Sequence, residues 1–199
     1  MPDPLILASG SSIRAEMLRR ACVPFEVILP RVDEETIKQA LQGDGAKPRD
    51  IADTLAEAKA RKVGSKHPDR LVLGTDQVLQ FGEDILSKPK SPDQALAQLQ
   101  SLRGKSHQLL SAAVVYENGK PVWRHISKAT LNMRDASDAW LLAYVERNWD
   151  SIQHSVGSYK IEEEGVRLFT RIEGDNFTIM GLPLLELLSY LTMRGSLPK

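Results

Sequence analysis

Short hydrophobic runs alternate with segments of helical periodicity along the chain, and Gly, Pro, Ser and Asp separate them. Apolar runs bounded by turn residues are typical of buried strands, whereas apolar residues three or four positions apart are typical of amphipathic helices. The pattern predicts strands at residues 5–8, 25–29, 70–76, 107–116, 121–133 and 166–172. It predicts helices at residues 11–22, 36–41, 50–66, 91–102, 137–147 and 184–193. This order mixes βα units with long hairpins and therefore predicts a mixed α/β sheet flanked by helices.

A further hairpin is predicted at residues 77–89, where "QVLQF" and "ILSKP" flank a three-residue turn at residues 82–84. With that turn, Phe81 faces Ile85 and Val78 faces Lys88. Residues two apart on a strand share a face, so Asp76 is expected diagonally beside Lys88. A carboxylate and an ammonium at the end of a buried strand suit catalysis. An ordinary cross-strand ion pair is the alternative.

The length and charge narrow the class of protein. The 199 residues are enough for one domain, or for two small lobes with a shared core. Lys plus Arg number 26, as do Asp plus Glu, so the net charge is zero, and nothing attracts nucleic acid or an anionic membrane. No apolar run approaches the roughly 20 residues of a membrane span, and no secretory leader is recognisable. We expect a cytoplasmic protein without nucleic-acid or membrane partners.

Cys22 is the only cysteine, which excludes an intrachain disulfide. Its apolar helical surroundings predict a buried packing residue rather than a nucleophile.

Lys59 interrupts an apolar helical stripe. Leu55, Lys59 and Val63 are four residues apart and lie on one helical face. A lysine in such a stripe points toward protein or toward the edge of a cleft. The alternative is a lysine whose stem is buried and whose ammonium group reaches water.

The first predicted turn, "ASGSSIR", is rich in small residues between a buried strand and a helix. Small residues let an anion approach the free N–H groups and the positive end of a helix dipole. Arg14, in the first helical turn, suits two-point binding of phosphate oxygens. Simple capping of the helix by Ser11 is the alternative.

Residues 33–35, "DEE", follow a strand and Pro30. Their carboxylates could hold a hard cation through oxygen ligands. An acidic first turn that stabilises a helix dipole is the alternative.

Together these segments resemble the Maf family of nucleoside triphosphate pyrophosphatases. The matching stretches, in the family's order, are "LILASGSSIRAEML", "VDEE", "AEAKARKV", "GTDQV", "ILSKP", "LRGKSH", "GSYKIEEEG" and "IEGDNFTIMGLPL". The resemblance implies a single domain over residues 1–199. A division of this domain into two lobes around a cleft is left open. It implies an elongated mixed sheet with a central nucleotide cleft, related to that of inosine triphosphate pyrophosphatases.

The resemblance also implies an activity and its residues. A nucleoside triphosphate is hydrolysed between its α- and β-phosphates, with magnesium or manganese as cofactor. Asp76 matches the catalytic acid, which acts as general base or metal ligand, and Glu34 matches an acidic residue near the metal. The residues that match phosphate-binding positions are Ser9, Ser11, Arg14, Lys59 and Lys88.

The base preference rests on three positions. Gln77 and Glu162 match the family's 7-methyl-GTP branch rather than its dTTP/UTP branch, whereas Ile13 matches neither. A carboxylate can accept the two adjacent N–H groups of a guanine edge, so a guanine-type or modified base is expected. The alternative substrate is dTTP or UTP.

A second functional class stays open, because Maf proteins are also associated with septum formation. A nucleotide-binding regulator of cell division would not need Asp76 beside two lysines, and this favours the enzyme. A homodimer is also left open by the sequence.

Overall fold

The computed structural model describes residues 3–198, which fall into two compact units. The first unit comprises residues 1–77, 111–127 and 176–199, and the second comprises residues 78–110 and 128–175. In chain order the elements are β1 (Leu5–Ala8), α1 (Ser12–Arg20), β2 (Phe25–Val27), α2 (Glu34–Gly43), α3 (Pro48–Gly64), β3 (Val72–Phe81), β4 (Asp84–Leu86), α4 (Pro92–Leu102), β5 (Ser106–Glu117), β6 (Lys120–Met133), α5 (Asp138–Ile152), the 3₁₀ turns η1 (Val156–Ser158) and η2 (Glu164–Leu168), β7 (Phe169–Glu173), α6 (Asn176–Ile179) and α7 (Leu184–Arg194).

The strands form a seven-stranded mixed sheet in the order β2-β1-β3-β5-β6-β7, with β4 paired to β3. Strands β3, β5 and β6 are long enough to pass from one unit into the other. The predicted mixed α/β sheet flanked by helices is confirmed. Within residues 3–198, no helix combines the length and apolar character needed to cross a membrane.

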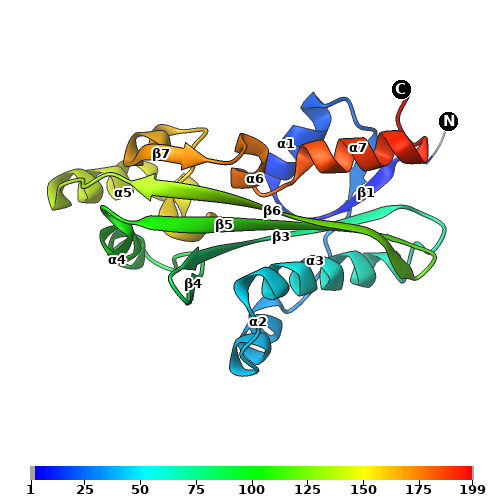
Figure 1. The fold of residues 1–199 in the computed structure, drawn as a ribbon, viewed down its shortest axis with the longest axis horizontal. Coiled ribbons are helices and arrows are strands. Elements are labelled where there is room, and N and C mark those ends of the chain that lie inside the picture. The colour runs from blue at the N-terminus through cyan, green and yellow to red at the C-terminus, as the bar shows by residue number, and fades with distance from the viewer. Residues whose placement is uncertain (1–2, 199) are drawn as a thin grey trace. The chain divides into compact units, whose positions relative to one another are not determined.

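The first unit is built around parallel strands. β1 pairs in parallel with β2 on one side and with β3 on the other. Helices α1 and α7 cover one face of these strands, and α3 lies along the opposite face (Figure 1). Leu7 and Leu73 of adjacent strands are fully buried with Leu18 of α1 and Leu187 of α7. This apolar contact fixes α1 against the end of β1.

Gly74 lets α3 approach β3 closely. A Cβ atom at this position would lie 2.1 Å from the carbonyl oxygen of Ala56 and 2.8 Å from the Cβ of Ala60. Only hydrogen therefore fits between strand and helix at this point. Small residues on both elements thus set the height of α3 over the sheet, and with it the position of Lys59.

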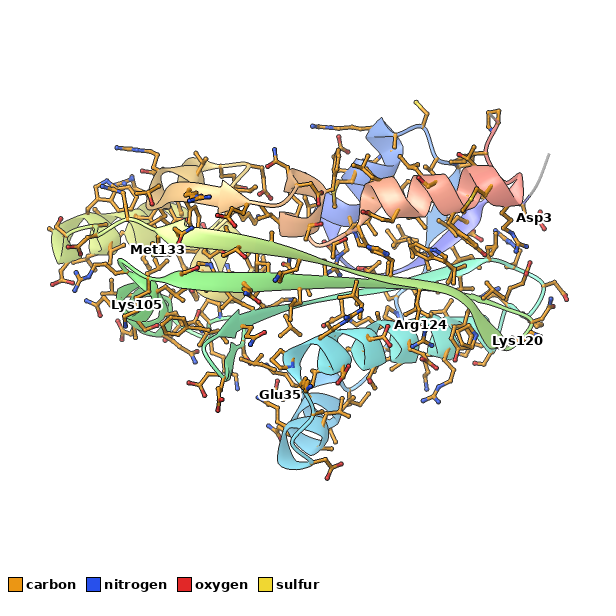
Figure 2. The ribbon with its side chains drawn as sticks, viewed as in Figure 1. Asp3, Glu35, Lys105, Lys120, Arg124 and Met133 are labelled. Carbon is orange, nitrogen blue, oxygen red and sulfur yellow. The ribbon has the colours of Figure 1, made fainter. Side chains whose placement is uncertain are left out.

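The β5–β6 hairpin is tied to the middle of α3 by an ion pair. Asn118 and Gly119 both have positive φ, as a two-residue type I′ turn requires. Arg124 of β6 points toward α3, where it binds Glu57 at 2.8 Å and also Asp53 (Figure 2). This pairing anchors the helix from its exposed side.

The second unit contains an aromatic and polar core. His107 of β5 is 2% exposed and its Nε2 lies 2.7 Å from the hydroxyl of Tyr159. Phe169 packs edge-on against Tyr159, with the ring centroids 4.8 Å apart. Helix α4 lies beside α5 and η1 in this unit.

The β3–β4 hairpin has a different register from the predicted one. Phe81 pairs with Asp84 and Leu79 pairs with Leu86, so the turn contains two residues rather than three. Gly82 has φ +62, which a type II′ turn places at its first central position. A shift of the register by one residue moves the side chain of each pairing partner to the opposite face of the sheet. The register argument that placed Lys88 diagonally beside Asp76 is therefore wrong.

Two other predictions also need correction. The strand predicted at residues 166–172 begins only at Phe169, because residues 164–168 form a 3₁₀ turn in which Gly165 approaches the backbone of Lys160 too closely for a Cβ. Cys22 is exposed rather than buried. It has φ +54, in the turn that leaves α1, and this conformation directs its side chain away from the core.

Candidate active site

The site begins where β1 ends beside the middle of its parallel neighbour β3. Ala8 of β1 pairs with Gly74 of β3, so the residues that follow these two partners lie next to each other. These residues are Ser9 after β1, and Thr75 and Asp76 within β3. In α/β sheets, ligands bind at the carboxyl ends of parallel strands. The parallel pairing thus brings residues 67 positions apart into one site.

Lys59 is the centre of this site. Its ammonium nitrogen lies 2.7 Å from the Oδ1 of Asp76 and 2.9 Å from the Oε2 of Glu34. The side chains of Lys59 and Asp76 are 6% and 9% exposed, whereas that of Glu34 is 48% exposed. The predicted Lys59 on an apolar stripe is thus a buried lysine that binds two carboxylates. It does not extend its ammonium group into open water.

Arg14 forms the second cationic element. Its Nε donates to the carbonyl oxygen of Gly181 at 2.8 Å, and its Nη1 donates to the Oγ of Ser9 at 3.3 Å and to the carbonyl oxygen of Thr75 at 3.4 Å. Gly181 has φ +96, and a Cβ there would lie 3.0 Å from the guanidinium. These contacts fix the guanidinium at the start of α1, next to Ser9.

Burial governs the charges in the site. It raises the pKa of Asp76 above its ordinary value, and the nearby cations Lys59 and Arg14 act in the opposite direction. Burial also lowers the pKa of Arg14, while the carboxylates of Asp76 and Glu34 favour its charged form. A desolvated carboxylate with a raised pKa in a polar site is typical of a group used for proton transfer.

A cavity of about 290 Å³ opens beside Lys59 in the first unit. Its polar wall is formed by Ser9, Glu34 and Lys59. The opposite wall includes Leu29 and Val32 from the loop after β2. A cation, a carboxylate and an apolar surface thus face a common space, as in sites for small polar ligands.

The first helical turn is arranged around two serines. The N–H of Ser11 donates to the Oγ of Ser9 at 3.2 Å, and the Oγ of Ser11 accepts from the N–H of Arg14 as the N-cap of α1. The capping role left open for Ser11 is therefore present in the structure. Ile13 lies next to Arg14 in the same turn and is partly buried.

Gln77 uses its amide nitrogen within the first unit. The nitrogen lies 3.0 Å from the Oγ of Ser111 and from the carbonyl oxygen of Thr178, and 2.9 Å from the carbonyl oxygen of Ile179. Its two N–H groups are thus directed at protein oxygens. To donate to a base, Gln77 would have to exchange one of these hydrogen bonds for one to the ligand.

Two of the predicted site residues belong to the second unit. Lys88 follows β4 and Glu162 lies in the segment between η1 and η2, and both are exposed. The first unit contains the remaining candidates and brings Ser9, Arg14, Glu34, Lys59 and Asp76 together.

The carboxylates restrict how a metal could be held. Among residues 3–198, no three or more His, Cys, Asp or Glu side chains form a group that could bind a metal ion. Asp76 and Glu34, however, both approach one point, the Lys59 ammonium. Magnesium is commonly held by one or two carboxylates together with substrate phosphates and water. The donor chemistry of these two residues fits that mode of binding.

The sequence did not reveal two backbone contributions to the site. The carbonyl oxygens of Thr75 and Gly181 fix Arg14, and the Oγ1 of Thr75 is buried with no hydrogen-bond partner among the described residues. Thr75 lies in the motif "GTD" and Gly181 in the motif "MGLP". They give no sign of which side chain the carbonyl groups bind.

Comparison with known proteins places this site in a family. The model for Maf-like proteins matches residues 4–194. The chain belongs to the Maf-like protein family. A relative named nucleoside triphosphate pyrophosphatase, from Ruegeria pomeroyi, is 61% identical to this Maf-like chain over 98% of each sequence. A relative of the same name from Roseobacter denitrificans is 62% identical over 100% of each.

More distant relatives carry another name. A protein from Brucella abortus named 7-methyl-GTP pyrophosphatase is 44% identical to this Maf-like chain over 96% of each sequence. A solved structure of a nucleoside-triphosphatase/dITP/XTP pyrophosphatase from Mycobacterium abscessus aligns with a TM-score of 0.45 at 16% identity over 99% of each chain. That similarity is too low to carry an argument, so the expected relation to inosine triphosphate pyrophosphatases stays a prediction.

Proposed function

We propose that this Maf-like chain is a pyrophosphatase that hydrolyses a nucleoside triphosphate between its α- and β-phosphates. The products are a nucleoside monophosphate and pyrophosphate. The observation that carries the proposal is the buried Lys59–Asp76 ion pair beside Arg14, where the carboxyl end of β1 lies next to β3. The names of its relatives from Ruegeria and Roseobacter support the same activity.

The cations bind the phosphates. A triphosphate carries several negative charges, and its hydrolysis requires those charges to be neutralised and positioned. Lys59 and Arg14 supply two fixed positive charges, and the start of α1 adds a favourable dipole. Lys88 is proposed as a further cationic ligand of the phosphates.

Asp76 activates the attacking water. Water attacks the α-phosphorus, the bond to the pyrophosphate oxygen breaks, and the water proton passes to the carboxylate of Asp76. Burial supports this role, because it raises the pKa of Asp76 and makes the carboxylate a stronger base than an exposed aspartate. Lys59, 2.7 Å away, keeps the carboxylate ionised enough to accept the proton.

A magnesium or manganese ion is proposed as cofactor. Asp76 and Glu34 would hold it, and phosphate oxygens would supply further ligands. When bound, such a cation neutralises phosphate charge and lowers the pKa of coordinated water. In that case Asp76 would be a metal ligand rather than the base itself, so a test of Asp76 alone does not separate the two roles.

A guanine-type or modified base is proposed for the substrate. Glu162 would accept from the two N–H groups of a guanine edge, a paired contact worth about 1–3 kcal/mol of discrimination. Gln77 and Ile13 are the other two residues proposed to set this preference. The 44% identical Brucella relative named 7-methyl-GTP pyrophosphatase supports the same class of base.

The activity and the base preference can be tested in one experiment. The purified chain is incubated with 7-methyl-GTP, GTP, UTP or dTTP and magnesium, and released pyrophosphate is measured. We expect pyrophosphate from at least one nucleotide, with the highest kcat/KM for a guanine-type base. No release from any nucleotide, with either magnesium or manganese, would refute the proposed activity. A highest kcat/KM for UTP or dTTP would refute only the base preference.

A further inference from the structure

The segment that carries Lys88 is bound to helix α4 on both sides of the lysine. Residues 87–90 connect β4 to α4 within the second unit (Figure 1). Lys88 is exposed, whereas the following Pro89 is buried. An exposed lysine on an unsupported loop would adopt many positions. The hydrogen bonds that flank Lys88 hold the backbone of this segment against α4.

Gln98 binds the residue before Lys88. Its Nε2 donates to the carbonyl oxygen of Ser87 at 2.8 Å, and its side chain lies at the buried face of α4, where the residue is 9% exposed. Its Oε1 accepts from the Oγ of Ser158 at 2.7 Å. Both ends of the amide are thus engaged, and this fixes which end faces Ser87.

Gln94 binds the segment on the other side of Lys88. Its Oε1 accepts from the N–H of Lys90 at 2.7 Å. Gln94 and Gln98 are one helical turn apart on α4 and share a face. A rigid helix thereby fixes one backbone group before Lys88 and one after it.

Ser158 is held in an unusual backbone conformation. It is fully buried with φ +62, a left-handed conformation that is uncommon for residues other than glycine. The preceding Gly157 has φ +78, and a Cβ there would lie 2.4 Å from the Cδ1 of Leu79. The next residue, Tyr159, is buried against His107. Strained backbone of this kind persists where the surrounding structure requires it.

We propose that Gln98, oriented by Ser158, is a positioning residue that fixes the backbone at Ser87 and thereby the backbone of Lys88, the proposed phosphate ligand. This inference rests on the proposed pyrophosphatase function. A preorganised backbone reduces the freedom that Lys88 loses on binding. The network joins buried side chains of α4 and η1 to the one segment of this unit that carries a proposed phosphate ligand.

The test compares two glutamines of the same helix. Gln98→Met removes both hydrogen bonds at similar volume. Gln100→Met is the matched control, because Gln100 donates to Asp138 on α5 and not to the lysine segment. Pyrophosphate release is measured for each variant. We expect Gln98→Met to lower kcat/KM by about tenfold to 10²-fold, as for a misplaced catalytic group. We expect Gln100→Met to stay within about twofold, as for a site that is not coupled to the reaction.

A double-mutant cycle separates positioning from general stability. Gln98→Met is also introduced into Lys88→Ala. If Gln98 acts through Lys88, it has nothing left to position, and the second substitution lowers kcat/KM by less than about twofold. A full, additive loss in the Lys88→Ala background would overturn the proposal, as would normal kcat/KM in Gln98→Met. Normal kcat/KM in Lys88→Ala would also overturn it, while the pyrophosphatase function would stand.

Gln98→Glu gives a second measurement if the methionine variant does not fold. An ionised glutamate can accept from Ser158 but cannot donate to the carbonyl oxygen of Ser87. A protonated glutamate can do both. We therefore expect the ratio of variant to wild-type kcat/KM to rise as the pH falls. A ratio of one at every pH would refute the proposal, and a reduced ratio that did not change with pH would assign the loss to structure rather than to this hydrogen bond.

Discussion

Asp76→Asn removes the charge of the proposed base and keeps its shape. Asparagine retains an oxygen that can accept from the Lys59 ammonium, and Lys59 keeps its contact with Glu34 at 2.9 Å. The substitution therefore does not isolate Lys59. It removes only the ability of residue 76 to accept a proton or to offer a negatively charged oxygen ligand.

The expected loss of rate is large. A positioned general base contributes about 10²–10⁴-fold, which corresponds to about 2.7–5.4 kcal/mol of activation free energy. Asp76 is buried and lies 2.7 Å from Lys59, and the asparagine at the same point offers no basic group in its place. We expect a loss within this range.

Unlike the rate, the free energy of unfolding is not expected to fall in Asp76→Asn. Burial raises the folded-state pKa of Asp76, so the folded chain binds this proton more tightly than the unfolded chain. Stability from this group is present while it is protonated and is lost as the pH rises through the raised pKa. Asparagine does not titrate. The variant is therefore expected to be at least as stable as the wild type at neutral pH, with an advantage that shrinks toward the ordinary pKa of aspartate.

The measurement combines pyrophosphate release with thermal unfolding at several pH values. Asp53→Asn is the control, because Asp53 is a carboxylate of the same unit that pairs with Arg124 instead. We expect this control to keep its kcat. Near-normal turnover in a folded Asp76→Asn protein would refute the assigned role. A large fall in Tm, with a rate that matches the folded fraction, would instead make Asp76 a structural residue.

Four further predictions follow from other parts of the structure. Lys59→Ala should lower kcat by about 10²–10³-fold, as for a lost charge-stabilising donor, and turnover equal to that of wild type would exclude Lys59 as a phosphate ligand. Glu162→Gln should lower the ratio of kcat/KM for GTP to kcat/KM for UTP by a factor that corresponds to about 1–3 kcal/mol, and it should lower the best rate less. An unchanged ratio would mean that another group binds the base edge. Gly74→Ala should lower the free energy of unfolding by about 1–3 kcal/mol or more, because its Cβ would lie 2.1 Å from the carbonyl oxygen of Ala56; a wild-type Tm would contradict the close packing of α3. Burial lowers the pKa of His107 from 6.5 to about 4, so at falling pH this histidine is protonated first in the unfolded chain. The free energy of unfolding should therefore fall by about 3 kcal/mol as the pH drops from about 6.5 to about 4. Denaturant unfolding should show this pH dependence in the wild type but not in His107→Gln.

The local pattern of the chain predicted most helices and strands because these depend on neighbouring residues. Serine is a preferred N-cap residue, and Ser11, Ser91 and Ser137 each cap a helix that the pattern predicts. Asn118 and Gly119 form the turn between the predicted strands 107–116 and 121–133, since few residues other than these adopt two successive positive φ angles. The family, too, follows from the order of its motifs.

The register of the β3–β4 hairpin was not correctly predicted from the sequence. The prediction takes "GED" as a turn of three residues, whereas the turn in the structure has two, and this difference of one residue places opposite faces of the strands together. The positive φ of Gly82 selects the shorter turn. The sequence thus predicted the β3–β4 hairpin and missed its pairing. A hairpin register depends on one backbone conformation that the hydrophobic pattern does not encode.

The sequence by itself determined the chemical character of the site, and the tertiary structure decided its contacts. The motifs identified Ser9, Arg14, Lys59 and Asp76 as candidates, and the hairpin argument assigned Lys88 as the partner of Asp76. The structure instead pairs Asp76 with Lys59. This choice depends on the parallel pairing of β1 with β3 and on the close approach of α3 at Gly74. Both are long-range packing contacts, whose energy comes from surfaces that meet only when the chain is folded.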